Sequence, residues 1–165
     1  MAVEGSLTKS ETYFQETYKM THFAEAISSA IEASGAILIS DYEIFLIACD
    51  IYRKKAVKYL RGEYPSIEQY KRARTVLKEA RVLDADKNYS RLWRVVSRGK
   101  QVADDIVCSA DPYCYISHLS AMQRYGLTMR RPEALYITRP TNAVVKGLLE
   151  ERKAKDHTRL VLPAE

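Results

Sequence analysis

The most informative segment of the chain is SIEQYKRARTVLKEAR, residues 66–81. Its first four residues form a capping box, because the Ser66 hydroxyl can accept a free backbone N–H and the Gln69 side chain can reach back. The turn GEYP at residues 62–65 separates it from what precedes, so we expect a helix that runs to about Arg81. Its apolar face is expected to point to the core and consists of Ile67, Tyr70, Ala73, Val76, Leu77 and Ala80.

Two further helices are expected before this one. Thr21 can cap a helix with apolar residues at helical spacing, and Gly35 can end it by taking a positive φ. The apolar run AILI at residues 36–39 then predicts a short strand. A second capping box, SDYE at residues 40–43, opens the next helix. That helix either continues to Leu60 or breaks near residues 53–55.

The pattern changes to strands after the basic helix. Val82 and Leu83 form a short apolar pair, residues 84–88 are a polar turn, and residues 91–96 predict a strand. The expected order is helix, strand, helix, turn, helix, strand, polar loop, strand. A winged helix-turn-helix has this order, and the second helix of its pair enters the major groove of DNA. We therefore expect an α+β, helix-rich fold with a winged helix-turn-helix over residues 21–96 and a wing over residues 84–90.

The charge of the chain is concentrated in this predicted domain. The net charge is +5, but residues 53–100 hold 15 Lys and Arg against 5 Asp and Glu. Residues 1–52 carry a net charge of −6, and residues 101–165 carry +1. A basic segment next to an acidic one is typical of a protein that binds a phosphate backbone. A solvated basic helix without a partner would have the same composition.

The predicted DNA contacts lie on the outward face of the basic helix and around the wing. Arg94 could instead cover the core with its aliphatic stem, and Tyr89 could stack on bases. Trp93 fits the core better than a stacking platform, because apolar residues surround it. The predicted contacts are Lys71, Arg72, Arg74, Thr75, Lys78, Lys87, Asn88, Arg91 and Arg94. Lys54, Lys55 and Lys58, on the preceding helix, are expected to contact backbone phosphates.

Residues 97–165 predict a second, small α/β unit. Ser97 is expected to cap a helix that ends near Cys108, and Ser117 a short helix closed by Gly126. A strand is expected at residues 134–138, between two prolines. A last helix would start at residues 141–142, and residues 160–162 predict a short final strand.

The segment CYISHLSAMQRYGL, residues 114–127, followed by the predicted strand at residues 135–138, resembles AbiEi-type antitoxins. The resemblance covers about residues 36–140, and these antitoxins belong to type IV toxin–antitoxin and phage abortive-infection systems. It implies a repressor that binds repeats in its own promoter and an antitoxin that opposes a nucleotidyltransferase-like toxin. The residues that carry it are Tyr115, Ser117, His118, Leu119, Ser120, Ala121 and Gly126.

Enzymatic and metal-binding classes fit the sequence poorly. Ser117 and His118 are adjacent, and side chains of adjacent helical residues point about 100° apart, which prevents a nucleophile–base pair. The acidic doublets at residues 104–105 and 150–151 lack the spacing of a metal site, and the six glycines form no phosphate loop. The three cysteines form no CxxC pair. We expect a protein that is not an enzyme and has no metal and no cofactor.

The same sequence predicts partners and location. The longest apolar run, residues 44–49, is far shorter than the ~18 residues of a membrane helix. Residues 1–20 are polar and unlike a secretion signal, and are expected to form a flexible arm. We expect a cytoplasmic, nucleoid-associated protein whose partners are double-stranded DNA and a cognate toxin protein, without a membrane. The alternative is a protein–protein interaction module of a defence or mobile-element system without specific DNA binding.

Overall fold

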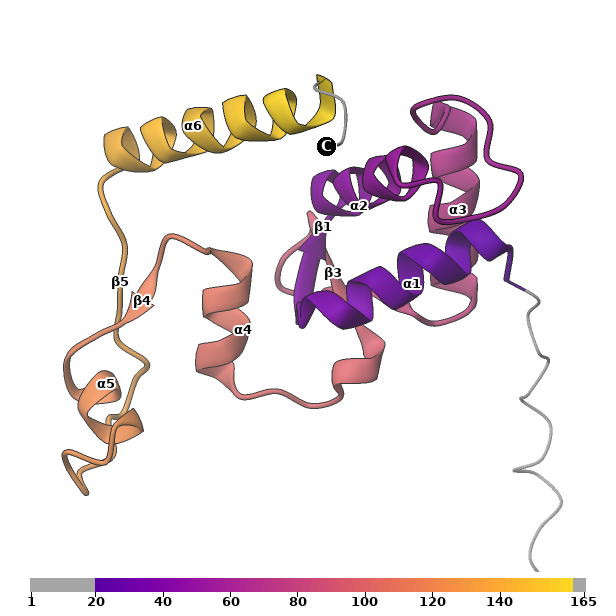
Figure 1. Ribbon diagram of the computed structural model, residues 1–165. Coiled ribbons are helices and arrows are strands. Elements are labelled where there is room, and N and C mark those ends of the chain that lie inside the picture. Colours follow the sequence, from indigo (N-terminus) through magenta and orange to yellow (C-terminus); the bar gives the residue numbers. More distant parts are fainter. Residues whose placement is uncertain (1–19, 162–165) are drawn as a thin grey trace, which may run out of the picture.

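The computed structural model describes residues 20–161 of the chain (Figure 1). The fold is α+β and rich in helices. The predicted arm at residues 1–20 lies outside the described residues, except for Met20, which packs against the core. In chain order the elements are α1 (His22–Ser34), β1 (Leu38–Ser40), α2 (Asp41–Arg53), α3 (Ile67–Glu79), β2 (Leu83–Ala85), β3 (Leu92–Val95), the 3₁₀ helix η1 (Val96–Arg98), α4 (Ala103–Ala110), β4 (Tyr115–Ile116), α5 (His118–Arg124), β5 (Ile137–Thr138) and α6 (Asn142–Val161).

The first three helices begin where the local sequence predicts. The Thr21 hydroxyl accepts a hydrogen bond from the Ala24 N–H at the start of α1, and Gly35 ends α1 with a φ of 73°. Both capping boxes are present, with Ser40 at the start of α2 and Ser66 at the start of α3. Such caps satisfy backbone N–H groups that a helix leaves without partners, so they confirm the three predicted starting points.

Helix α2 breaks near residues 53–55, which is one of the two alternatives that the sequence left open. Lys54 occupies the C-cap, and Lys55 takes a left-handed conformation with a φ of 47°. The N–H of Ala56 donates to the carbonyl of Ile51 and closes the end of the helix. A residue with this φ cannot continue a right-handed helix, so residues 54–65 form a link between α2 and α3.

The first sheet joins strands that are far apart in the sequence. Its order is β1-β3-β2, and both pairings are antiparallel. Trp93 of the central strand is paired with Ile39 on one side and with Ala85 on the other. Strands β1 and β3 are shorter than predicted, since β1 begins at Leu38 and β3 ends at Val95. Strand β2 instead includes residues 84 and 85, which were predicted as part of the polar turn.

Helices α1, α2 and α3 pack on this sheet around one hydrophobic core. Ile27, Ile44, Leu77 and Val95 are fully buried in it. The predicted inner face of α3 is buried at Tyr70, Ala73 and Leu77 and partly buried at Val76 and Ala80. The prediction was wrong for Ile67, whose side chain is 54% exposed. This residue occupies the first position of α3, a full turn before the deeply buried part of the helix begins.

The second half of the chain departs further from the sequence-based expectation. Ser97 does not cap a long helix, because it lies within η1, and α4 begins only at Ala103 without a side-chain cap. The predicted strand at residues 134–138 is reduced to β5, which pairs with β4. The predicted final strand is wrong at residues 160 and 161, which extend α6 to 20 residues, while residue 162 lies outside the described residues.

Helix α6 lies beside α2 (Figure 1), and side-chain hydrogen bonds join the two helices. Arg152 Nη2 is 2.8 Å from Glu43 Oε1, and the Tyr42 hydroxyl donates to Asp156 Oδ2 at 2.9 Å. Burial alone would raise the pKa of Glu43, but hydrogen bonds from the Ser40 N–H and from Arg152 outweigh it and hold the pKa below its usual value. The carboxylate that caps α2 therefore also fixes α6.

Candidate nucleic-acid interface

The outward face of α3 carries exposed polar and cationic side chains. Lys71, Arg72, Thr75 and Lys78 are all exposed. The Thr75 hydroxyl donates its hydrogen to the Lys71 carbonyl at 3.0 Å, so within this helix it remains available only as an acceptor. Lys71 and Arg72 thus supply the free donors of this face near the start of α3.

Arg74 differs from its neighbours because its side chain already has partners within the protein. Its Nη1 lies 3.0 Å from both carboxylate oxygens of Asp41, at the start of α2. The guanidinium also lies 6.0 Å from the ring centroids of Tyr70 and Trp93. These contacts explain Arg74 by its role in joining α3 to α2 and β3, and a DNA contact from this residue stays a prediction.

Asp41 is the residue that sequence reasoning missed. Its carboxylate accepts hydrogen bonds from Arg74 and from Trp93 Nε1, the latter at 3.0 Å, while its carbonyl accepts from the Tyr70 hydroxyl at 2.8 Å. Burial and the nearby Asp41 carboxylate raise the pKa of Tyr70 to about 12, so this hydroxyl stays a donor. The sequence signal was an acidic residue in the first turn of a capped helix, which by itself predicts only a favourable helix dipole.

Trp93 connects the outward face of α3 to the sheet. Lys78 Nζ lies 5.0 Å from the centroid of its ring, within the range of a cation–π interaction. Trp93 is partly buried and packs against the core, in agreement with the core assignment made from the sequence. Tyr89, which the sequence suggested could stack on bases, is half-buried, and such stacking stays a prediction.

The turn between β2 and β3 is held by a buried carboxylate. The side chain of Asp86 is 1% exposed and accepts hydrogen bonds from the N–H groups of Asn88 and Tyr89, at 2.9 and 3.0 Å. Arg94 Nε donates to the same carboxylate at 3.0 Å. Burial by itself raises the pKa of Asp86, but the Asn88 N–H, the Arg94 guanidinium and the Tyr89 N–H together hold that pKa below its usual value.

This turn brings three predicted contacts together at the surface. Lys87, Asn88 and Arg91 are exposed around it. Arg94 is half-buried, and its ion pair with Asp86 means that it shapes the turn from behind. A DNA contact from Arg94 stays a prediction.

Replacing Asp86 with Asn should destabilise the protein by about 1–3 kcal/mol at neutral pH, because Arg94 would lose its carboxylate partner. A carboxyl group whose pKa is lowered by folding stabilises the folded state above its unfolded pKa, and this contribution is lost as the pH falls through the folded value. The difference between the two proteins should therefore be full at pH 7 and shrink below about pH 4. Urea unfolding at several pH values measures it, and a difference that grows as the pH falls would contradict the assignment.

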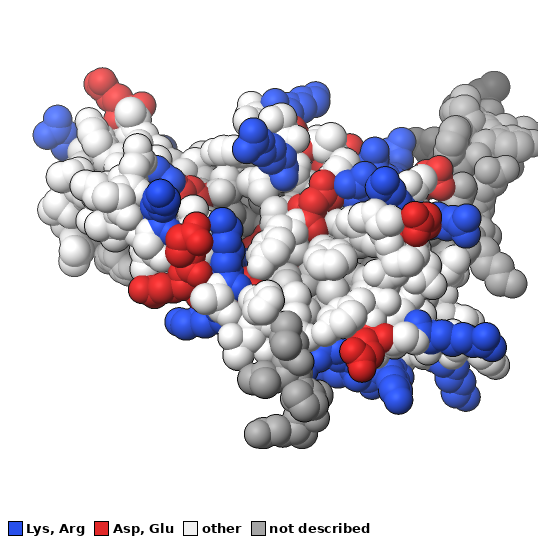
Figure 2. Space-filling model, turned by 90° about the horizontal axis from the view of Figure 1, so that it is seen from above, with Lys and Arg blue, Asp and Glu red and all other residues white. Residues whose placement is uncertain are grey.

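The three lysines predicted as phosphate contacts do not lie on the body of a helix. Lys54 is the C-cap of α2, and Lys55 and Lys58 lie in the link that follows. All three are exposed. On the face of the molecule seen in Figure 2, Lys and Arg side chains form several separate groups with Asp and Glu among them. The concentration of charge along the sequence therefore does not give one uninterrupted basic surface on that face.

The residues on which the resemblance to AbiEi-type antitoxins depends span β4, α5 and the turn that follows α5. Leu119 and Ala121 are half-buried, and Tyr115 and Gly126 are exposed. Ser117 is buried, and its hydroxyl makes no hydrogen bond, so it is the N-cap of α5 by position only. His118 takes a φ of 49°, and its ring lies edge-to-face with that of Tyr136.

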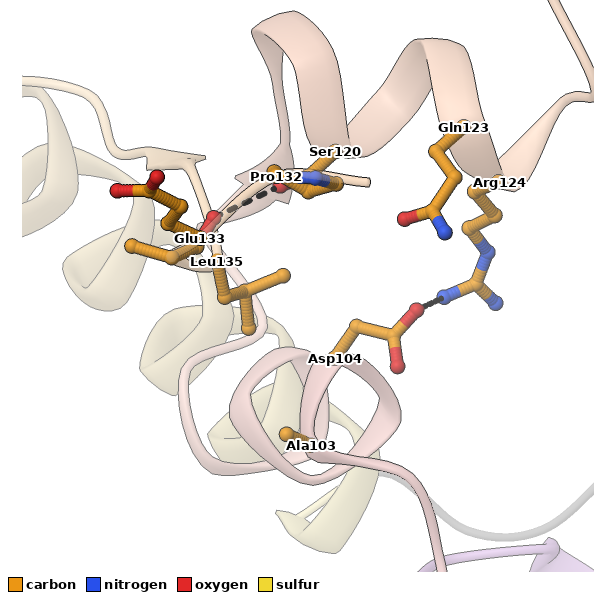
Figure 3. A pocket seen from close by; sticks show the side chains of 9 residues that line it. Ala103, Asp104, Ser120, Gln123, Arg124, Pro132, Glu133 and Leu135 are labelled. Atoms are coloured by element: carbon orange, nitrogen blue, oxygen red, sulfur yellow. Dashed lines mark hydrogen bonds and ion pairs between the residues drawn. The ribbon is translucent and has the colours of Figure 1, made fainter. Parts of the chain in front are cut away.

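A pocket of about 420 Å³ lies beside α5 and is bordered by Asp104, Ser120, Arg124 and Leu135 (Figure 3). Arg124 forms ion pairs with Asp104 at 2.6 Å and with Asp105 at 2.9 Å. The Ser120 hydroxyl accepts the Tyr136 N–H at 2.9 Å. The side chains of Asp104, Ser120 and Arg124 at its wall are thus engaged by the protein itself.

Comparison of the chain with protein-family models, with curated proteins and with solved structures gave no significant match. No helix within residues 20–161 has both the length and the apolar character needed to cross a membrane. In the same part of the chain, no three His, Cys, Asp or Glu side chains are grouped so as to hold a metal ion.

Proposed function

We propose that this protein is a sequence-specific DNA-binding regulator, and that residues 21–96 act as a winged helix-turn-helix. The order α1-β1-α2-α3-β2-β3 supports this reading, because a winged helix-turn-helix has its helices and strands in this order. Helices α2 and α3 would be the helix pair, with α3 as the recognition helix in the major groove. The hairpin of β2 and β3 would supply the wing.

The observation that carries the proposal is the division of α3 into two faces. Tyr70, Ala73 and Leu77 are buried on one side, while Lys71 and Arg72 are exposed on the other. A recognition helix must be held firmly from behind and offer long hydrogen-bonding side chains in front. The capping box at Ser66 sets the start of the helix, and the burial of Tyr70, Ala73 and Leu77 fixes which residues point outward.

The proposed residues are divided into those whose side chains would contact DNA and those that are already paired within the protein. Lys71 and Arg72 would read base edges or phosphates, while Lys87 and Arg91 would contact the adjacent backbone from the wing. Lys54, Lys55 and Lys58 would add phosphate contacts, together with Asn88 and Lys78. Arg74 and Arg94 would act mainly as positioning residues, since each is already paired with an aspartate.

A gel-shift titration with the DNA upstream of the protein's own gene, and with random DNA, tests this function. Binding to phosphates releases counterions, so about five such contacts should weaken binding roughly 500-fold between 50 and 200 mM salt. The upstream DNA should bind more tightly than random DNA at both salt concentrations. Equal affinity for the two DNAs would contradict sequence-specific recognition, and absence of binding at 50 mM salt would contradict the proposal as a whole.

The resemblance to AbiEi-type antitoxins extends the proposal to a toxin partner encoded by a neighbouring gene. A regulator of this kind would lie on the nucleoid in the cytoplasm and would need no cofactor or catalysis. Co-expression with the neighbouring gene's product should relieve growth arrest and yield a co-purified complex. Growth arrest that persists with the protein present would contradict the antitoxin role and leave DNA binding unaffected.

A second candidate function is a protein–protein interaction module. It is favoured by large apolar side chains that the second half of the chain leaves exposed, namely Tyr125 at 76%, Leu127 at 71% and Met129 at 98%. Clusters of exposed apolar residues mark interaction sites more often than ordinary surface. Replacing Leu127 and Met129 with serine should abolish binding to the neighbouring gene's product under this hypothesis, without changing the gel shift.

A further inference from the structure

A pair of thiols lies outside the proposed DNA interface. Cys108 belongs to the last turns of α4, and Cys114 follows six residues later, just before β4. Both are free and half-buried. The third cysteine, Cys49, is fully buried in α2.

The connection between α4 and β4 folds back so that the Cys114 thiol lies against the part of α4 that carries Cys108. The Asp111 N–H donates to the Val107 carbonyl at 3.0 Å, and the Cys114 N–H donates to the Asp111 carbonyl at 3.1 Å. The Cys114 thiol itself lies 3.7 Å from the same Val107 carbonyl. The backbone therefore directs the Cys114 side chain onto the last turns of α4, where Cys108 is placed.

We propose that Cys108 and Cys114 are a modification site at which a low-molecular-weight disulfide forms an intramolecular disulfide bond. The Cys114 sulfur lies 3.7 Å from the carbonyl of Val107, the residue before Cys108, and the two sulfurs must close to the S–S distance of about 2.05 Å. Both side chains are partly exposed, so a small disulfide such as oxidised glutathione can approach them. Cys49 lacks this access.

The chemistry is thiol–disulfide exchange in two steps. The Cys108 thiolate attacks one sulfur of oxidised glutathione, forms a mixed disulfide and releases the first glutathione thiolate. The Cys114 thiolate then attacks the Cys108 sulfur and releases the second. The two cysteines lose two electrons, oxidised glutathione gains them, and the two thiol protons end on the two molecules of reduced glutathione.

Cys114 is the second nucleophile in this sequence because its thiol is hard to ionise at the start. Burial, together with the adjacent Cys108 side chain, raises the pKa of Cys114 to about 11. The attack by Cys114 should therefore limit the rate at neutral pH, since only the thiolate is nucleophilic. In the mixed disulfide the Cys108 thiol no longer exists, and its contribution to the raised pKa disappears.

The bond would connect the start of β4 to a fixed point of the fold. Ser109, next to Cys108, accepts the Leu38 N–H at 3.0 Å and so ties α4 to β1. A disulfide at Cys108 would join the segment that leads to β4 and α5 to this anchor. We expect backbone hydrogen exchange over residues 111–116 to be slower in the oxidised protein than in the reduced one.

The test uses the full chain incubated with oxidised glutathione, then alkylated and digested with trypsin. Cys108 and Cys114 fall in one tryptic peptide, residues 101–124, while Cys49 falls in the peptide that ends at Arg53. The expected result is a peptide 101–124 that carries no alkyl group and is 2 Da lighter than the dithiol, as two lost hydrogens require. Cys49 should remain reduced.

Cys108→Ser and Cys114→Ser variants should each lose this product, and a Cys49→Ala variant should keep it. Two alkyl groups on peptide 101–124, a glutathione adduct that never resolves, or a link to Cys49 would overturn the proposal. The measurement on the unaltered chain decides the outcome even if a variant folds poorly. Because it involves no DNA, its result is independent of the proposed regulatory function.

Discussion

Replacing Lys71 and Arg72 together with alanine is expected to weaken binding to the specific DNA by about 2–6 kcal/mol, because each side chain is expected to contribute about 1–3 kcal/mol. This corresponds to a loss of roughly 30-fold or more in affinity. Fluorescence anisotropy with labelled upstream DNA at a fixed salt concentration measures the change. Both residues are exposed on α3, so the fold itself should be unaffected.

The two side chains are expected to dominate because they are the cations of α3 without a competing internal role. Arg74 is held by Asp41, and Lys78 lies over the Trp93 ring. An arginine that contacts a guanine edge also distinguishes bases, whereas the loss of a phosphate contact lowers the affinity for all sequences about equally. Removal of Arg72 should therefore reduce the preference for upstream over random DNA if it reads a base.

The matched control is the double substitution of Arg130 and Arg131 with alanine. This is also an adjacent, exposed pair of basic residues, but it lies in the loop after α5. It removes the same charge, so a loss as large as that of the Lys71 and Arg72 variant would mean that only net charge matters. Unchanged affinity of the Lys71 and Arg72 variant would exclude α3 as the recognition helix.

Replacing Leu77 with alanine is expected to lower the free energy of unfolding by about 2–5 kcal/mol. Leu77 is fully buried on the inner face of α3, within the cluster that joins the three helices and the sheet. Truncation removes its contacts and leaves a cavity that the surroundings fill only in part. Because natural domains are stable by about 5–15 kcal/mol, the variant would lose a large part of its stability.

Urea unfolding followed by the fluorescence of the single tryptophan measures this change, since Trp93 packs against the same core. Ile67→Ala is the control on the same helix, because its side chain is 54% exposed. It should cost less than about 1 kcal/mol, as expected for a surface position. Equal effects of the two substitutions would mean that α3 does not pack as described.

The starting points of α1, α2 and α3 could be predicted because they depend on residues within one helical turn. The hydroxyls of Thr21, Ser40 and Ser66 each meet an N–H three residues away. The length of α6 could not be predicted, since residues 160–162 are equally compatible with a strand until their contacts are known. The Tyr64 hydroxyl donates to the Leu160 carbonyl at the end of that helix, 96 residues away in the sequence.

For the proposed DNA interface, the sequence by itself determined which residues are cationic and which face of α3 is apolar, because both follow from composition and helical period. Tertiary structure alone decided which cations are free. Asp41 pairs with Arg74 across 33 residues, and Asp86 pairs with Arg94 across a turn. An ion pair forms where folding brings two charges together in space, and distance along the chain does not reveal that.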